Sequence, residues 1–251
     1  MARLVRSLTQ FRRHWRELGS GDAVLGYLPL HPGEEVKLLD LVVRGVSFFP
    51  PVLAQLLARS KVAQAEVLAA FMAPGTFVAY SQADLTARLP EYHSRDRVVT
   101  KRDRAHLGLG VSLWSSLEDL YSLGGLQPLP FPLVVQPFVP GATDLRVVVV
   151  GDYREAYERI NPHGFRKNLF QGGSSRAAAL TPEVLDFCQR VMARGQFPYA
   201  ILDLLLRPEG QPFLAEINLK GGLTGARLTQ AQFQERVAAL EEDFHRRWAS
   251  S

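Results

Sequence analysis

The chain has 251 residues, of which 47% are hydrophobic and 22% are charged, and its formal net charge at pH 7 is +4. A chain of this length and composition can bury a substantial core, and no run approaches the ~18 uninterrupted apolar residues that a membrane span needs. Five arginines and one glutamate in residues 1–17 account for the whole net charge, so the remainder is neutral and no nucleic-acid-binding surface is expected.

Cysteine usage and the N-terminal residues indicate the compartment. The single cysteine, Cys188, cannot form an internal disulfide. It lies in a helical pattern beside Leu185 and Met192, so we expect a buried thiol. The N-terminus lacks the apolar stretch of a secretory signal. A reducing cytoplasm is therefore the expected location.

The first sixty residues predict a helix and two strands. The helix is indicated by apolar residues at helical spacing: Leu4, Leu8, Phe11 and Trp15. Strands are expected at residues 23–30 and 38–46. A two-strand unit leaves open edges and an apolar face, and it is marginal in water unless something covers it. We expect either a homodimer, in which a second copy covers this unit, or a monomer capped by a closing helix at residues 229–248.

Residues 61–128 are expected to form a first α+β subdomain. A helix is predicted at residues 61–72, and strands are predicted near residues 76–80 and 98–101. The proline-rich stretch at residues 127–132 indicates a linker.

Residues 129–251 are expected to form a second subdomain with two hairpins and two helices. Thr181 followed by Pro182 and Glu183 is a typical helix start. The second helix is the closing helix at residues 229–248.

The most informative segment, residues 201–218, predicts a β-hairpin. Two apolar runs flank a turn at residues 207–212. A turn centred there places Asp203 opposite Glu216, and the alternation of side chains puts Asn218 on the same face as Glu216. The same register directs four apolar side chains into a core: Leu202, Leu204, Leu214 and Ile217.

Two facing carboxylates repel and would weaken this hairpin unless a cation lay between them. A hard, oxygen-seeking ion such as Mg²⁺ suits one or two carboxylates together with phosphate oxygens. The alternative interpretation is the solvated polar face of an amphipathic sheet.

Residues 144–159 predict a second hairpin, with a β-branched run at residues 147–150 and a turn supplied by residues 151–152. Centring the turn directly after residue 152 would place Arg146 opposite Arg159. Two guanidinium groups on one face favour an anion such as phosphate or carboxylate. Together the two hairpins carry the groups that a metal–nucleotide complex needs.

Several segments occur in the order found in one known superfamily: SKVAQAEVLAAFMAPGTFV, VVTKRDRAHLGLGV, VVQPFVPGATDLRVVVVGD, ERINPHGFRKNLFQGG, LTPEVL, AILDLLL and FLAEIN. Between residues 61 and 225, about two thirds of the chain, the sequence resembles the RimK-like branch of the ATP-grasp enzymes. This branch includes the ribosomal-protein glutamate ligase and is more distantly similar to glutathione synthetase.

The resemblance implies an α+β ATP-grasp fold, in which two α+β subdomains sandwich ATP. They would be residues 61–128 and residues 129–251, and the second would hold the metal site. The family normally has a full N-terminal α/β domain that helps to define the substrate, whereas only residues 1–60 precede the first lysine of the motif here. We therefore expect a reduced N-terminal unit.

The resemblance also implies the cofactors ATP and Mg²⁺, with Mn²⁺ as an alternative metal. Carried over by position, the nucleotide contacts would be Lys61 and Lys101 at the phosphates, Gly108 and Gly110 in the mobile loop over them, Gln136, Pro137, Phe138 and Val139 at the adenine, Asp144 at the ribose, and Arg166 and Asn168 of an R-x-N motif. Arg146 and Arg159 would face the reacting phosphoryl and acyl groups. Asp203, Glu216 and Asn218 match the magnesium ligands of the family.

Two departures from the family pattern affect these assignments. Pro137 replaces a glutamate and has no backbone N–H, so its contact with adenine is limited to its carbonyl. Residues 219–222 replace a serine–proline pair near the substrate.

The implied function is ATP-dependent ligation of a carboxylate to an amine through an acyl phosphate, which forms an amide or peptide bond. A peptide side chain, an amino acid and a natural-product precursor are all compatible substrates. One alternative is a small-molecule kinase on the same scaffold. Another is a non-catalytic nucleotide-binding or peptide-binding module, which the short N-terminal unit and Pro137 suggest. The intact lysines and metal ligands favour an enzyme.

Overall fold

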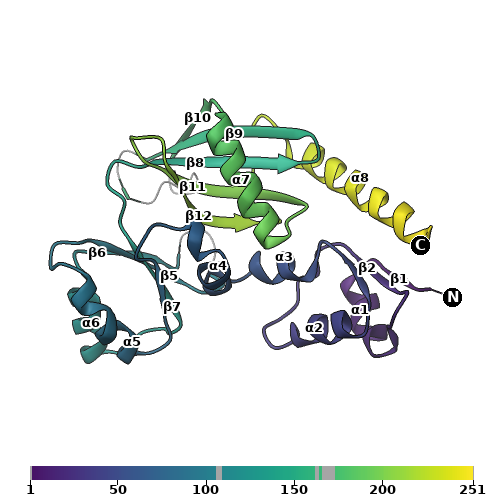
Figure 1. Ribbon diagram of the computed structural model, residues 1–251, viewed down its shortest axis with the longest axis horizontal. Helices are drawn as coiled ribbons and strands as arrows, with labels where there is room; N and C mark the ends of the chain where they lie inside the picture. The colour runs from purple at the N-terminus through teal and green to yellow at the C-terminus, as the bar shows by residue number, and fades with distance from the viewer. Residues whose placement is uncertain (1, 106–108, 162–163, 166–172, 251) are drawn as a thin grey trace.

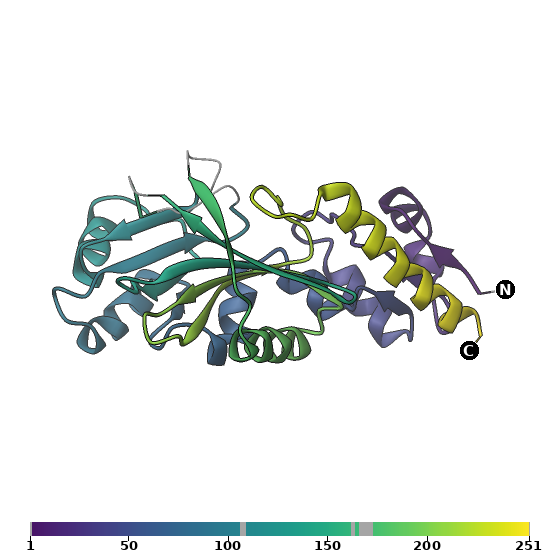
Figure 2. The ribbon, with the colours of Figure 1, turned by 90° about the horizontal axis from the view of Figure 1, so that it is seen from above.

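Within the described residues, three β-sheets form the framework of the protein (Figure 1). The computed structural model describes residues 2–105, 109–161, 164–165 and 173–250. The molecule is elongated, with a four-stranded sheet at one end, an N-terminal unit at the other and a five-stranded sheet toward the middle (Figures 1 and 2). This confirms the mixed helix and sheet architecture expected from the sequence.

The N-terminal unit is a three-stranded parallel sheet with helices in its connections. Its elements are β1 (Leu4–Val5), α1 (Leu8–His14), η1 (Trp15–Glu17), β2 (Ala23–Leu25), α2 (Val36–Val43) and β3 (Ser47–Phe49), and the strand order is β1-β2-β3. The expected strand at residues 23–30 is confirmed only over its first three residues. Gly26 follows with a φ of 98°, a left-handed conformation that ends the extended segment.

The strand expected at residues 38–46 is wrong, because Val36–Val43 form helix α2. Leu38 and Leu41, about one helical turn apart, are fully buried, whereas Val43 is 88% exposed. An uninterrupted run of leucine and valine fits both the strand period and the helix period. The helix forms here because it buries one side of the run in the core and leaves the other side exposed.

The expected N-terminal helix is present, but it begins later than the apolar stripe suggested. Ser7 is its N-cap and accepts a hydrogen bond from the backbone N–H of Gln10 at 3.2 Å. Leu4 lies in strand β1 instead, while Leu8 and Phe11 do lie on the helix. Phe11 is fully buried in the core of this unit.

The four-stranded antiparallel sheet has the order β4-β7-β5-β6. It is reached through α3 (Val52–Leu57), α4 (Lys61–Val67) and η2 (Ala69–Phe71), and it comprises β4 (Phe77–Ala79), β5 (Val98–Arg102), β6 (Val111–Trp114) and β7 (Leu133–Pro137), with α5 (Gln82–Arg88), η3 (Leu89–Glu91) and α6 (Leu117–Leu126).

Strand β7 bears on where the two subdomains divide. It follows residue 128, after which we expected the second subdomain to begin, yet it pairs with β4 and β5 of the first sheet. Strand β8 (Thr143–Val150) is the first strand of the five-stranded sheet. We therefore propose that the division lies between β7 and β8, in residues 138–142.

The five-stranded antiparallel sheet has the order β10-β9-β8-β11-β12. Besides β8 it comprises β9 (Tyr153–Ile160), β10 (Ser174–Ala178), β11 (Tyr199–Leu206) and β12 (Pro212–Asn218), with helices α7 (Pro182–Gly195) and α8 (Gln230–Ala249). Helix α7 starts after its N-cap Thr181, as predicted. Cys188 is fully buried on this helix, and burial raises the pKa of its thiol to about 12.

Helix α8 connects the five-stranded sheet to the N-terminal unit, and the two chain ends lie near each other (Figure 2). The indole Nε1 of Trp248 donates to the carbonyl of Gly21 at 3.0 Å, and the rings of Phe244 and Phe49 are 5.4 Å apart. None of the helices in the described ranges has the length and apolar character needed to cross a membrane.

Candidate active site

The β11–β12 hairpin has the predicted register at the candidate metal ligands. Asp203 pairs with Glu216, and Ile201 pairs with Asn218. The two carboxylates therefore come from neighbouring strands, and the amide lies two residues beyond Glu216. These oxygen donors are of the kind that Mg²⁺ binds in proteins. In the part of the chain that the structure describes, no group of three or more His, Cys, Asp or Glu side chains is placed to hold a metal ion, so two carboxylates and one amide are the candidate set.

A β-bulge interrupts the pairing of the hairpin directly after the candidate metal ligand Asp203. Asp203 pairs with Glu216, but the next residue, Leu204, pairs with Leu214, which leaves Ala215 as the extra residue. Strict alternation would have put Leu214 and Glu216 on one face. The bulge lets Leu214 enter the core, where it is fully buried, while Glu216 stays partly exposed.

Two lysines from other elements reach this hairpin. Lys61, the first residue of α4, places its Nζ 3.0 Å from Oε1 of Glu216 and 2.8 Å from the carbonyl of Ala105. Lys101, on β5, donates from its Nζ to the carbonyl of Ala215 at 2.9 Å. Burial lowers the pKa of Lys101 to about 8, and Glu216 opposes that shift. Both predicted phosphate lysines thus lie beside the candidate metal ligands.

The predicted register of the other hairpin is wrong by two residues. Arg146 does not face Arg159; it pairs with Tyr157, and Arg159 pairs with Asp144. The reason is a tighter turn than we assumed, because only residues 151–152 lie outside the pairing.

Nevertheless, both guanidinium groups meet at one carboxylate. Arg146 donates from Nε and Nη2 to the two oxygens of Asp203 at 2.7 and 2.9 Å, and Nη2 of Arg159 lies 3.1 Å from Oδ2 of Asp203. Nε of Arg159 also donates to Asp144 at 2.7 Å. Burial would raise the pKa of Asp203, but the two arginines hold it well below its usual range. Asp203 is therefore kept as a carboxylate, the form that a metal ion requires.

The predicted adenine hinge lies at the end of β7. Gln136 is 2% exposed, and its Nε2 has no hydrogen-bond partner among the described residues. A buried donor without a partner is costly, so this atom fits a ligand that brings an acceptor. The N–H of Phe138 donates to the carbonyl of Arg97 at 2.9 Å, and the Arg97 guanidinium lies 4.1 Å from the Phe138 ring centre. These contacts fix the segment that contains Pro137 and Val139.

One glycine of the predicted phosphate-covering loop has a clear steric role. A Cβ on Gly110 would lie 2.4 Å from the Cβ of Ala105 and 3.0 Å from that of Arg102. Its carbonyl accepts from the N–H of Arg102 at 2.8 Å. The close approach of Ala105 and Arg102 therefore requires glycine at position 110. Three other predicted nucleotide contacts lie outside the described residues: Gly108, Arg166 and Asn168.

Sequence reasoning missed Gln64, which links α4 to β12. It is 1% exposed, its Oε1 accepts from the N–H of Ile217 at 3.0 Å, and its Nε2 donates to the carbonyl of Ile217 at 2.9 Å. Ile217 lies between Glu216 and Asn218, so the amide of Gln64 holds the backbone that carries both. The only sequence signal is its place three residues after Lys61, on the same side of the helix.

The chain belongs to the RimK-like ATP-grasp family, because the model of the RimK-like ATP-grasp domain matches residues 53–239. Members of this family use ATP together with a divalent metal ion. The chain is similar to the ribosomal protein bS6–L-glutamate ligase of Escherichia coli, with 30% identity over 179 residues. The match covers 68% of this chain and 59% of that ligase, so the chain spans less than two thirds of the length of this curated relative.

Solved structures show the same fold. N5-carboxyaminoimidazole ribonucleotide synthetase in complex with ADP matches with a TM-score of 0.65 and 13% identity, over 94% of this chain and 63% of that chain. A RimK domain ATP-grasp protein from Sphaerobacter thermophilus matches with a TM-score of 0.57 and 18% identity, over 88% and 80% of the two chains. At these identities the likeness concerns the fold alone, and it confirms the expected ATP-grasp architecture.

The lowered pKa of Lys101 predicts opposite pH dependences for stability and ATP binding. In the unfolded chain this lysine has its ordinary pKa of 10.5, so the apo protein should gain stability as pH rises above about 8. ATP affinity should fall over the same range, because the phosphates need the ammonium form. Calorimetry at fixed excess magnesium should detect proton uptake on ATP binding, and Lys101→Arg should remove it. Equal pH profiles for the two proteins would contradict this assignment.

Gln64→Leu should raise the magnesium concentration needed for half-maximal ATP binding by roughly tenfold, because β12 loses the partner of Ile217 and the candidate ligands lose their fixed spacing. Gln55→Leu is the matched control. Gln55 is equally buried and accepts from Leu28 N–H at 3.1 Å and donates to the Pro50 carbonyl at 2.8 Å, but it has no bond to β12. Both variants should lower the thermal midpoint. An equal change in magnesium dependence in both would show that Gln64 is only structural.

Proposed function

We propose that the protein is an ATP-dependent carboxylate–amine ligase. The observation that carries this proposal is that Asp203 and Glu216 pair with three cationic side chains from α4, β8 and β9, while Lys101 of β5 donates to the neighbouring carbonyl of Ala215. Oxygen donors for a metal and cations for phosphates lie side by side, as a metal–nucleotide complex requires.

The carboxylate–cation pairs suggest how the nucleotide would be accepted. Lys61 pairs with Glu216, and Arg146 pairs with Asp203. When a metal ion binds the two carboxylates, Lys61 and Arg146 become free to bind phosphate oxygens. Each charged group then exchanges one partner of opposite charge for another, so none is left buried without a partner. The bound metal would supply a divalent charge that neutralises the phosphates. Asp203, Glu216 and Asn218 would hold it, and Lys61 and Lys101 would bind the phosphates of ATP.

In the proposed reaction, an oxygen of the substrate carboxylate attacks the terminal phosphorus of ATP, and ADP leaves. An amine then attacks the carbonyl carbon of the acyl phosphate, phosphate leaves with the bonding electrons, and the amine loses its proton. Arg146 and Arg159 would stabilise the charge that spreads over the transferred phosphoryl group. Gln136, Pro137, Phe138 and Val139 would form the adenine hinge, and Asp144 would lie at the ribose. Gly110, together with Gly108, Arg166 and Asn168, completes the proposed nucleotide set.

The substrates are proposed to be a small-molecule or peptide carboxylate and an amine. The E. coli relative is named for a glutamate ligation to a ribosomal protein, which supports an amine or carboxylate from the amino acids or from a peptide. We place the reaction in the cytoplasm, because the only cysteine is a buried free thiol.

Glu216→Ala should abolish ATP turnover while leaving the protein folded, because it removes one proposed metal ligand and the partner of Lys61. A screen for ADP release over amino acids and peptides, each with candidate amines, would identify the substrates. Glu209→Gln, in the exposed turn of the same hairpin, is the matched control and should retain activity.

Hydroxylamine added to the active protein should trap the acyl phosphate as a hydroxamate. A stable phosphorylated product in its place would identify a small-molecule kinase. ATP binding without ADP release from any carboxylate would identify a non-catalytic module.

We further propose that the protein forms a homodimer through helix α2. This helix carries a cluster of exposed apolar side chains: Val36 at 63%, Leu39 at 51%, Val42 at 49% and Val43 at 88%. An apolar surface of this kind marks an interaction site, and a second copy of the same helix would cover it symmetrically.

Val43→Glu should convert the dimer to a monomer, because it puts two charges into the shared apolar interface. Light scattering at micromolar concentration should fall to the 27.9 kDa mass of one chain. Leu126→Glu is the control, since Leu126 is 86% exposed at the end of α6. A mass of one chain for the unaltered protein would refute the dimer.

A further inference from the structure

The ammonium of Lys61 has two acceptors in the structure, and the proposed nucleotide complex would leave it one of them. Its Nζ lies 3.0 Å from Oε1 of Glu216 and 2.8 Å from the carbonyl oxygen of Ala105. A metal ion bound to Glu216 would take the first acceptor. The carbonyl of Ala105 would then orient the ammonium, so the contacts that fix Ala105 also fix Lys61.

Arg104, the residue before Ala105, is held by the N-terminal unit. It donates from Nη1 and Nη2 to the two carboxylate oxygens of Glu35, both at 2.8 Å. A bidentate pair of this kind fixes geometry as well as charge. The backbone of Arg104 has a φ of 55°, a left-handed conformation that residues with a Cβ rarely adopt. Such a conformation persists where surrounding contacts enforce it, and the pair with Glu35 is such a contact.

Glu35 also lies beside the segment that leads into Lys61. Nη1 of Arg59, two residues before Lys61, is 3.6 Å from Oε1 of Glu35. Arg59 is buried, and its Nη2 donates to the carbonyl of Leu28 in the N-terminal unit at 2.8 Å. One carboxylate therefore gathers the two chain segments that meet in the contact between Lys61 and Ala105.

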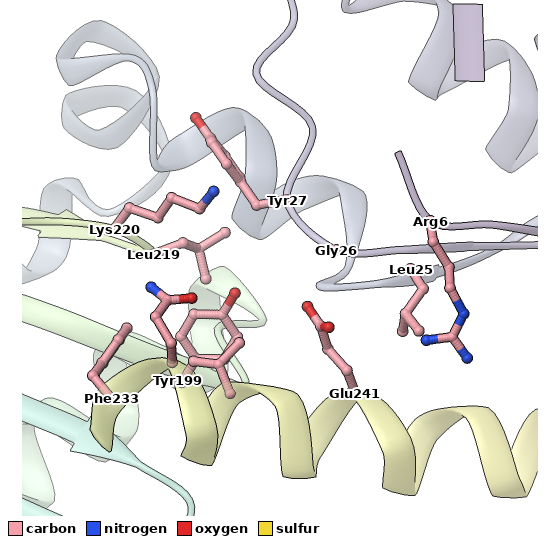
Figure 3. A pocket seen from close by; sticks show the side chains of 11 residues that line it. Arg6, Leu25, Gly26, Tyr27, Tyr199, Leu219, Lys220, Phe233 and Glu241 are labelled. Carbon is pink, nitrogen blue, oxygen red and sulfur yellow. The ribbon is translucent and has the colours of Figure 1, made fainter. Parts of the chain in front are cut away.

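Tyr27 fixes the N-terminal unit in the same region. The Arg59 guanidinium and the Lys220 ammonium each lie 5.1 Å from the centre of the Tyr27 ring. Figure 3 shows the Lys220 side chain extending toward Tyr27 from the segment after β12. Because Lys220 follows Asn218 by two residues, the unit that carries Glu35 is held against the segment that follows the candidate metal ligands.

We propose that Glu35 is a positioning residue for Lys61 and that the N-terminal unit is therefore part of the nucleotide site. Glu35 acts through Arg104, which fixes the carbonyl of Ala105, and this carbonyl orients the Lys61 ammonium toward the phosphates of ATP. This inference rests on the proposed function, because the orientation of Lys61 matters for ATP only if Lys61 binds the phosphates.

Calorimetry of magnesium–ATP binding tests this proposal. Glu35→Gln removes the charge and one acceptor oxygen, so ATP affinity should fall roughly tenfold, the effect of losing about one hydrogen bond to a charged group. Glu34→Gln is the matched control. Glu34 pairs with Arg12 and Lys37 inside the N-terminal unit, so its loss should leave ATP affinity unchanged. The thermal midpoint of each variant, measured in parallel, separates a loss of folding from a loss of affinity.

The same loss is expected from the other side of the ion pair. Arg104→Gln should weaken ATP binding as much as Glu35→Gln does, whereas Arg102→Gln should not. Arg102 follows Lys101 on β5 and is exposed, so its side chain is directed to the opposite face of the strand.

A double-mutant cycle with Lys61 provides a measurement that a merely structural residue would not change. In the Lys61→Met background, Glu35→Gln should have no further effect on ATP affinity, because the group that Glu35 positions is gone. Equal losses of affinity in both backgrounds would show that Glu35 acts on stability or on another group, and would overturn the proposal.

The outcomes also separate this inference from the proposed function. If Lys61→Met weakens ATP binding but Glu35→Gln does not, the positioning role is wrong and the assignment of Lys61 to the phosphates stands. If Lys61→Met leaves ATP affinity unchanged, Lys61 does not bind the phosphates, and both that assignment and the role of Glu35 are refuted.

Discussion

The arrangement of opposite charges across neighbouring strands is the constraint on which the candidate site depends. Strand pairing brings Asp144, Arg146, Arg159 and Asp203 into one buried cluster in which each carboxylate meets at least one guanidinium. Burying any of these groups alone would be strongly unfavourable, so the strands can hold them there only as a set. Lys61, which lies on a helix outside the sheet, pairs with Glu216 in the same way. The apo protein therefore carries a charge-balanced site that is already assembled.

Local patterns predicted the hairpin that carries the candidate metal ligands. The turn at residues 207–212 was recognisable from its proline and glycine, but it places Leu206 opposite Pro212 and Leu204 opposite Leu214. The predicted pair of Asp203 with Glu216 forms because the bulge at Ala215 shifts the register by one residue. The other hairpin failed because a shift of the turn by one residue moves every pair by two, and the sequence around residues 151–152 fits either position. The bulge at Ala215 could not be predicted from the local sequence, because it depends on the burial of Leu214 and is not marked by a turn residue.

Features that depend on tertiary packing were not predictable from one sequence. The run at residues 36–43 became a helix because one side of it could be buried, and β7 joined the first sheet although it follows the proline-rich linker. Gln64 was missed for the same reason, since its partner Ile217 is 153 residues away along the chain. The resemblance to a family indicated the candidate metal ligands, whereas only the structure shows which residues position them.

The contacts on β12 also bear on how far the two subdomains can separate. This strand is at the edge of the five-stranded sheet, and such edges invite pairing with other chains. Gln64 occupies the N–H and carbonyl of Ile217, and Lys101 occupies the carbonyl of Ala215. Side chains of α4 and β5 thus close an edge that would otherwise be free to recruit a foreign strand. If the four-stranded sheet and α4 moved away from β12, these hydrogen bonds would break and the edge would be uncovered. The same few bonds would therefore limit both domain motion and aggregation.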